Sequence, residues 1–125
     1  MSMMFRKSAV IAAMLLAPMA AGADDQVDPK ACEGASTYEI VECLKSQTAQ
    51  WDNRLNVAYQ QAIKKAAPKQ QDQLRAAQRL WIEYRHANCL FYGLGEGTIA
   101  RIEAGSCMLT MTEARARELE GLGRQ

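Results

Sequence analysis

The chain has 125 residues, 49% of them hydrophobic, and its 15 basic and 14 acidic side chains leave a formal net charge of +1. This length allows one domain with a modest core, for which cross-links add useful stability. The balanced charge argues against nucleic acid or an anionic membrane as the main partner.

Residues 1–23 have the pattern of a cleaved Sec signal peptide. Arg6 and Lys7 form the positive start, residues 9–17 are apolar, and residues 21–23 offer a small-residue cleavage site. The apolar stretch is shorter than the roughly 20 residues that a membrane-spanning helix needs. No cysteine follows it directly, which argues against a lipid anchor. We therefore expect an exported protein, periplasmic in a cell with two membranes, with no membrane anchor after cleavage.

Four cysteines lie beyond the predicted leader, and an exported chain with four cysteines is expected to form two disulfides. We favour pairing between neighbours, Cys32–Cys43 and Cys89–Cys107, because it closes two short loops. The pairing Cys43–Cys89, which leaves Cys32 with Cys107, stays open, since two antiparallel helices could bring Cys43 and Cys89 to similar heights. With no C-x-x-C motif and one histidine, the chain has no zinc-site pattern.

Residues 24–35 are polar and are expected to form an irregular lead. The helical domain is expected over residues 36–125, starting at a capping box in which Ser36 and Glu39 satisfy each other's backbone amides. A first helix should run to Ala67, and the polar run 46–48 is a weak point where it is expected to kink or restart. Its predicted inner face is Ile40, Cys43, Leu44, Trp51, Leu55, Ala58, Tyr59, Ala62, Ile63 and Ala66.

Pro68 disfavours helical geometry in the residue before it and suits the first turn of a second helix. The glycines of residues 93–97 end that helix, and Thr98 is a candidate N-cap for a third. The predicted inner face of the second helix is Leu74, Ala77, Gln78, Trp81, Tyr84, Arg85, Asn88 and Cys89. That of the third is Ile99, Ile102, Met108, Leu109, Met111, Thr112, Arg115, Leu119 and Leu122.

These patterns predict an all-α fold, a three-helix antiparallel bundle braced by two disulfides. The first two helices are expected to form a long antiparallel hairpin, with the third packed across it. Gly105 is expected to weaken the third helix locally.

Polar residues on the inner faces predict a network between the helices. Trp81, Arg85 and Cys89 recur every four residues and share one helical face. We expect Arg85 to pair with Asp52, because a charge held between helices needs a partner and would set their register. Asn56 and Tyr59 are expected to join Gln78 and Arg115 in the same network. A structural role is favoured over a catalytic one for all seven: Asp52, Asn56, Tyr59, Gln78, Trp81, Arg85 and Arg115.

The glycine-rich loop after the second helix is the candidate partner-binding surface. It carries the residues Phe91, Tyr92, Leu94, Glu96 and Thr98. Exposed aromatic side chains on a tethered loop suit protein recognition, although an ordinary connector explains the pattern equally well. No spacing of nucleophile and base indicates an enzyme, and no cofactor or metal site is expected.

A set of residues spread over nearly the whole mature chain matches one known family. The set is Cys32, Thr37, Glu39, Cys43, Asp52, Leu55, Asn56, Tyr59, Leu74, Gln78, Trp81, Tyr84, Arg85, Cys89, Gly97, Thr98, Cys107, Thr112, Arg115 and Leu119. It resembles the LprI family of lysozyme inhibitors, specifically the LprI N-terminal-like domain. Glu96 stands where that family often has the first of two adjacent glycines.

The resemblance implies an exported binding protein that inhibits lysozyme-type muramidases by occluding their active-site cleft, with a lysozyme as its protein partner. Tyr92, the backbone amides of residues 93–97 and Thr98 are the candidate donors to the carboxylates of that cleft. The alternative is a non-inhibitory periplasmic interaction or immunity module for another envelope protein or toxin.

Overall fold

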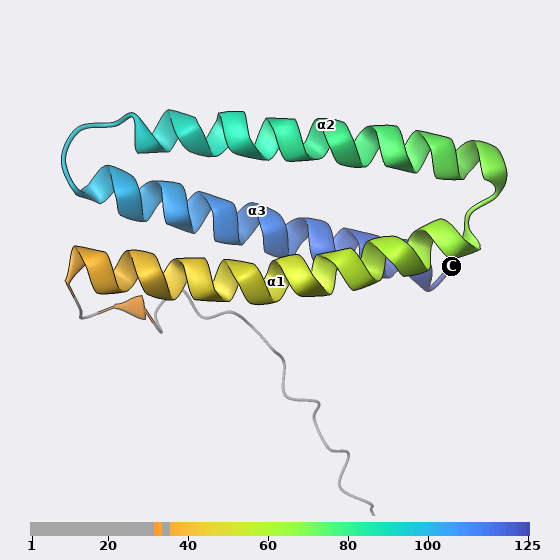
Figure 1. Cartoon of the computed structure of the whole chain (residues 1–125), viewed down its shortest axis with the longest axis horizontal. Coiled ribbons are helices and arrows are strands. Elements are labelled where there is room, and N and C mark those ends of the chain that lie inside the picture. Colours follow the sequence, from red (N-terminus) through yellow and green to blue (C-terminus); the bar gives the residue numbers. More distant parts are fainter. Residues whose placement is uncertain (1–31, 34–35) are drawn as a thin grey trace, which may run out of the picture.

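The computed structural model describes residues 32–33 and 36–125, and it is built from three long helices (Figure 1). They are α1 (Thr37–Lys65), α2 (Pro68–Gly93) and α3 (Ile99–Gly123). The predicted all-α class is therefore confirmed. The expected signal peptide and all of the expected lead except Cys32 and Glu33 lie outside the described residues.

Helix α1 begins as its capping box predicts. The Ser36 amide donates to Glu39 Oε2 over 2.9 Å, and the Glu39 amide donates to Ser36 Oγ over 3.3 Å. The expected interruption at 46–48 is wrong, because one helix runs through this segment. The Thr48 hydroxyl donates to the Leu44 carbonyl one turn earlier over 2.8 Å, so it stays within the helix and does not compete with it.

The turn between α1 and α2 is fixed by side chains from the start of α2. Helix α1 ends at Lys65, two residues before the predicted end. The side-chain amide of Gln71 donates to the carbonyls of Ile63 and Ala66, at 2.8 Å and 3.2 Å. Gln71 thereby satisfies carbonyls that the end of α1 leaves without helical partners.

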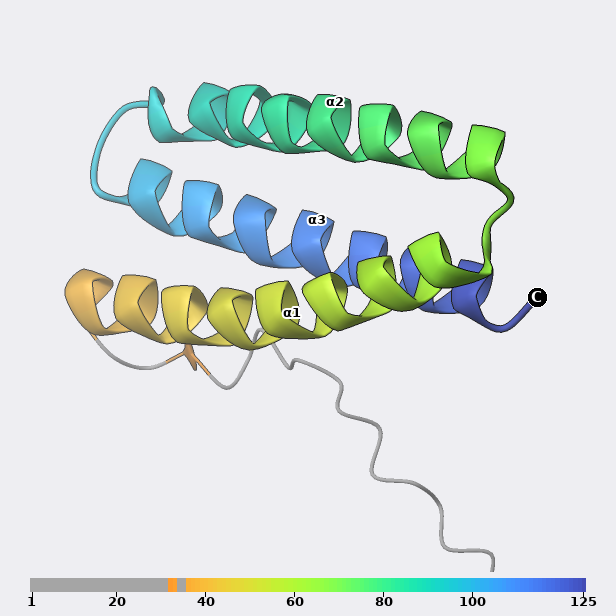
Figure 2. The same ribbon diagram turned by 45° about the vertical axis from the view of Figure 1, so that its right-hand side comes forward.

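Helix α3 lies between the other two helices, which corrects the predicted packing order. Figure 1 and Figure 2 show α1 and α3 side by side and running in the same direction, with α2 antiparallel to them on the far side of α3. Contacts of α2 are mainly with α3, and α1 and α2 scarcely touch. Helices α1 and α2 are antiparallel and joined by a short turn, as predicted, but they do not pack directly on each other, because α3 lies between them.

The hydrophobic core lies mainly between α1 and α3. Helix α1 contributes Leu44, Trp51, Leu55 and Ala58, and helix α3 contributes Leu109, Ala116 and Leu119. Gly105 allows the two helices to approach, because a Cβ at this position would lie 3.1 Å from Leu44 Cδ1. The glycine that weakens α3 by its low helix propensity thus permits a close contact with Leu44 of α1.

Helix α2 is only thinly buried. Its buried residues are Gln78, Arg85 and Cys89, two of which are polar. Tyr84 was expected to face inward, but 60% of its surface is exposed, and Ala77 is exposed as well. The reason is that α2 has one neighbouring helix rather than two, so only a narrow stripe of its surface is covered.

The two disulfides join neighbouring cysteines. Cys32 pairs with Cys43, and Cys89 pairs with Cys107, which confirms the favoured pairing and excludes the alternative. The first bond holds the end of the lead against α1, and the second joins the last turns of α2 to α3. In the chain-entropy model each such short loop stabilises the fold by roughly 3 kcal/mol.

A tryptophan between two guanidinium groups fixes the register of α1 on α3. Trp51 is 2% exposed, with Arg54 Cζ 4.6 Å and Arg117 Cζ 4.9 Å from its ring centroid. Arg54 also donates both Nε and Nη2 to the Glu120 carboxylate. The hydrogen bond from Arg54 is the main reason that the pKa of Glu120 is lowered, and the charges of Arg54, Arg117 and Arg124 act in the same direction.

We expect Gly105 and Gly121 to respond in opposite ways to substitution. Gly105→Leu should lower the free energy of unfolding by about 1–3 kcal/mol, because the new side chain meets Leu44. Gly121→Ala should raise it by up to about 1 kcal/mol, because that helical position has room for a Cβ. Urea unfolding of both variants checks this, and a stabilised Gly105→Leu protein would contradict the close approach of α1 and α3.

The Glu120 carboxylate should contribute to acid sensitivity. Its pKa lies below the ordinary value of 4.5, so its contribution is present above pH 4.5 and is lost as the pH falls through the folded-state pKa. Glu120→Gln should lower the free energy of unfolding at neutral pH by less than about 1 kcal/mol, because the ion pair is partly solvated. Urea unfolding across the acidic range should show the difference between the two proteins shrinking; parallel curves would exclude this role.

Candidate functional site

One guanidinium group connects all three helices. Arg85 of α2 donates through Nη1 to Asp52 Oδ1 of α1 over 3.0 Å and to Thr112 Oγ1 of α3 over 2.8 Å. The Trp81 ring lies 4.8 Å from Arg85 Cζ, a cation–π distance. Arg85 is 8% exposed, so its charge is held in place by these groups rather than by water.

A second polar contact joins α2 to α3, two helical turns before Arg85 along α2. Arg115 Nε donates to Gln78 Oε1 over 3.0 Å, and Arg115 Nη1 lies 2.8 Å from Glu118 Oε2. The structure does not bring the other two expected members into this contact. In the part of the chain that it describes, Asn56 is exposed, and neither Asn56 nor Tyr59 makes a side-chain hydrogen bond.

Thr112 is a partner of Arg85 that was not predicted from the sequence. Its hydroxyl accepts from Arg85 and donates to the Met108 carbonyl over 2.6 Å, so both of its hydrogen-bonding roles are used. The available signal was a threonine on the expected inner face of the third helix, where a hydroxyl needs a partner; the structure buries it fully. Glu118, which pairs with Arg115, gave no such signal because it sits on a solvated face.

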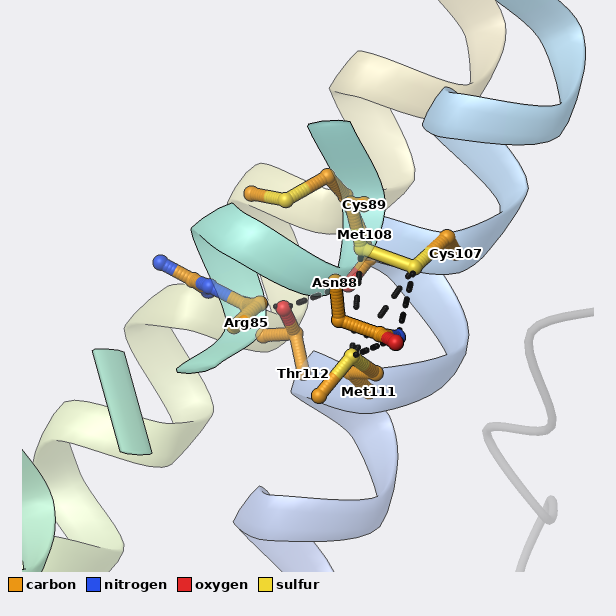
Figure 3. The surroundings of a disulfide bond; sticks show 7 residues. All are labelled: Arg85, Asn88, Cys89, Cys107, Met108, Met111 and Thr112. Atoms are coloured by element: carbon orange, nitrogen blue, oxygen red, sulfur yellow. Dashed lines mark hydrogen bonds between the residues drawn. A yellow bond between two sulfur atoms is a disulfide. The ribbon is translucent and has the colours of Figure 1, made fainter. Parts of the chain in front are cut away.

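A sulfur cluster anchors the base of the loop between α2 and α3. Met111 Sδ lies 3.8 Å from the Sγ atoms of both Cys89 and Cys107. Figure 3 shows Asn88 beside the disulfide and Met111, and its side-chain amide lies 3.3 Å from Met111 Sδ and 3.5 Å from Cys107 Sγ. These contacts fix the last turn of α2 on α3 one turn before the loop begins.

The loop between α2 and α3 lies at one end of the bundle, and two of the residues expected on it, Phe91 and Tyr92, belong to the last turn of α2. Phe91 is 74%, Leu94 76% and Tyr92 40% exposed, and Glu96 and Thr98 are exposed as well. The rings of Phe91 and Tyr92 meet edge to face with centroids 5.3 Å apart. Exposed apolar groups on a loop whose base is held by a disulfide are typical of protein-recognition surfaces.

The backbone of the loop leaves hydrogen-bond donors unused. The amides of Leu94 and Gly95 donate to the carbonyls of Leu90 and Tyr92, at 3.0 Å and 3.1 Å. Within the described residues, the amides of residues 96–98 donate to no backbone acceptor, and the Thr98 side chain does not cap α3. Gly97 adopts a φ of +74°, which a residue with a side chain rarely adopts.

A groove of about 530 Å³ opens beside this end of the bundle. It is lined by Val41, Lys45, Thr48, Ala49, Asp52, Gly93, Arg101, Ala104, Gly105 and Met108. Its apolar floor lacks a facing pair of carboxylates or a nucleophile with a base. No cluster of three or more histidine, cysteine or acidic side chains suited to a metal occurs in residues 32–33 and 36–125.

These features define a class of protein: a small, disulfide-braced helical scaffold with an exposed loop at one end. The model of the family described as lysozyme inhibitor LprI matches residues 29–119, and the chain belongs to this family of inhibitors. Comparisons with curated proteins and with solved structures found no match. In the described residues, no helix combines the length and apolar character needed to cross a membrane.

The three-helix contact of Arg85 predicts a measurable coupling between α1 and α2. Asp52→Ala should lower the free energy of unfolding by about 1–2 kcal/mol, because Asp52 is partly solvated and Arg85 keeps Thr112. Arg85→Ala should lower the free energy of unfolding by about 2–4 kcal/mol, since it also removes the packing on Trp81.

The double variant tests whether the two residues act together, and its coupling energy should be about 1 kcal/mol or more. Urea unfolding of both single variants and the double variant provides the measurement. The exposed pair Glu42–Lys45 within α1 is the matched control, with an expected coupling of at most about 0.5 kcal/mol. Equal coupling in the two pairs would contradict a linking role for Arg85.

Proposed function

We propose that this protein is an exported, non-enzymatic binding protein that inhibits lysozyme-type muramidases in the periplasm by inserting its α2–α3 loop into their active-site cleft. Membership of the LprI family supports inhibition of lysozyme. The observation that points to this loop is its combination of exposed apolar side chains with a base fixed by the Cys89–Cys107 disulfide. A loop already held in shape loses little entropy on binding.

The proposed mechanism matches donors on the loop to acceptors in the cleft. Lysozyme-type enzymes cleave sugar chains with a pair of carboxyl groups, and burying those groups requires hydrogen-bond donors. The unused amides of residues 96–98, the Thr98 hydroxyl and the Tyr92 hydroxyl are the donors that this loop offers. The amides of Leu94 and Gly95 already donate to carbonyls of the same chain, so we exclude them as donors to the cleft.

Apolar contacts would add affinity around these hydrogen bonds. Phe91 and Leu94 flank the donors, and burying each of their side chains contributes about 1.5–3 kcal/mol. Glu96 lies on the same loop and would pair with the cationic rim that lysozymes commonly carry. The protein as a whole has little net charge, so electrostatic steering toward a cationic enzyme is expected to be weak.

The test is a turbidity assay in which lysozymes of several types clear bacterial cell walls in the presence of the purified, oxidised protein. Inhibition is expected at a stoichiometric excess of the protein. Tyr92→Ala should raise the inhibition constant by about 10- to 100-fold, because it removes both a ring and a donor from the centre of the proposed contact.

Tyr38→Ala is the matched control, since Tyr38 is 73% exposed on the first turn of α1, outside the loop. It should inhibit like the unchanged protein. Absence of inhibition for every lysozyme type at large excess would overturn the proposal. Recovery of one other envelope protein from periplasmic extract would then favour a non-inhibitory interaction or immunity module.

A further inference from the structure

An unpaired arginine lies in the groove beside the loop. Arg101 of α3 is exposed, and in the part of the chain that the structure describes its side chain makes no hydrogen bond or ion pair. The other lysine or arginine within residues 36–52 and 86–108 is Lys45, which pairs with Glu42 over 2.9 Å. This end of the bundle therefore carries one positive charge that the described residues leave without a partner.

Arg101 lies on the inner face of α3, where an unpaired charge is unusual. Thr112 and Leu119, both 0% exposed, follow it by about three and five helical turns, so the three residues share one face. Figure 1 and Figure 2 show α1 and α2 farther apart at the loop end than at the turn that joins them. The face that is closed around Thr112 is therefore open at Arg101, where the groove of about 530 Å³ lies.

The acidic side chains nearest in the fold do not neutralise Arg101. Asp52 lines the same groove, but it accepts a hydrogen bond from Arg85 over 3.0 Å. Glu96 and Glu103 are exposed, and neither forms an ion pair with Arg101. The guanidinium is therefore available for a negative group that a partner supplies.

We propose that Arg101 is the charged anchor of the inhibitory surface and binds the ionised carboxylate of the catalytic pair in the target enzyme. This inference rests on the proposed function and adds to it the residue that recognises charge. Enzymes that cleave sugar chains with two carboxyl groups keep one protonated as the acid and the other ionised. A planar guanidinium can form two parallel hydrogen bonds with an ionised carboxylate, whereas the amides and hydroxyls of the loop carry no charge.

The spacing of the donors suits a pair of carboxyl groups. The Arg101 amide donates to the Thr98 carbonyl over 3.2 Å, so Arg101 lies one turn, about 5 Å, beyond the last of the unused loop amides. The two carboxyl groups of such an enzyme are about 5–9 Å apart. The amides of residues 96–98 can therefore face the protonated group while Arg101 faces the ionised one.

Inhibition constants of Arg101 variants test the proposal on a lysozyme that the unchanged protein inhibits. Arg101→Ala should raise the inhibition constant at least about 30-fold, because it leaves a carboxylate buried without its partner. Arg101→Lys should recover part of this loss, since an ammonium group keeps the charge but lacks the planar fork. Arg79→Ala is the matched control, because Arg79 is exposed on α2 and does not line the groove, and it should inhibit like the unchanged protein.

Targets in which one catalytic carboxylate is changed to its amide separate direct pairing from an indirect effect. Calorimetry measures their binding, because such targets lack activity. With the native target, Arg101→Ala should bind at least about 30-fold more weakly than the unchanged protein. With the normally ionised carboxylate changed to an amide, the two proteins should differ by less than about 3-fold. With the acid carboxyl changed instead, the large difference should remain.

The outcomes distinguish this inference from the proposed function. Equal inhibition by the unchanged protein and Arg101→Ala would overturn the role of Arg101 and leave the proposed inhibition standing. An equal loss on native and amide targets would also overturn it, because Arg101 would then act away from that carboxylate. Inhibition of no lysozyme by the unchanged protein would overturn both.

Urea unfolding of Arg101→Ala is the control for a structural role. The side chain is exposed and makes no hydrogen bond within the described residues, so the midpoint should equal that of the unchanged protein. A clearly destabilised variant would indicate that Arg101 supports the fold and would count against the proposal.

Discussion

The fold depends on the enclosed charge of Arg85. Helix α2 has a thin apolar stripe and covers few core residues, so hydrophobic burial alone would hold it weakly. Arg85 supplies a directional link, since one guanidinium satisfies Asp52 on α1 and Thr112 on α3. A sliding movement of α2 by one turn would leave that charge without partners at high cost. The polar contact therefore sets the register, and the disulfide at Cys89 fixes the end of the same helix.

Local features were predictable from sequence, because each depends on residues close together in the chain. The capping box at Ser36, the turn at Pro68 and the short-range disulfides are of this kind. The Arg85–Asp52 pair was also predictable, since a charge on an inner face needs a partner. For the candidate loop, the exposure of Leu94 was expected from the glycines around it, whereas the unused amides depend on a backbone conformation that the sequence does not fix.

The packing order was not predictable, because all three helices show helical periodicity and periodicity does not say which faces meet. The deciding residue is Gly105, whose missing side chain lets α3 lie against Leu44 of α1. In the sequence that glycine indicates only a weak point in a helix. The prediction that Tyr84 faces inward failed for the same reason, since the face of α2 that carries Tyr84 would be buried only if α1 packed directly on α2.

The parallel course of α1 and α3 has an electrostatic consequence for the end of the bundle that carries the loop. Both helices begin there, while only α2 ends there (Figure 1). Two positive ends of helix dipoles thus oppose one negative end. Glu39 neutralises much of the field at the start of α1, but the first turn of α3 contains no acidic residue. The remaining field favours negatively charged groups at this end, independently of the protein's near-zero net charge.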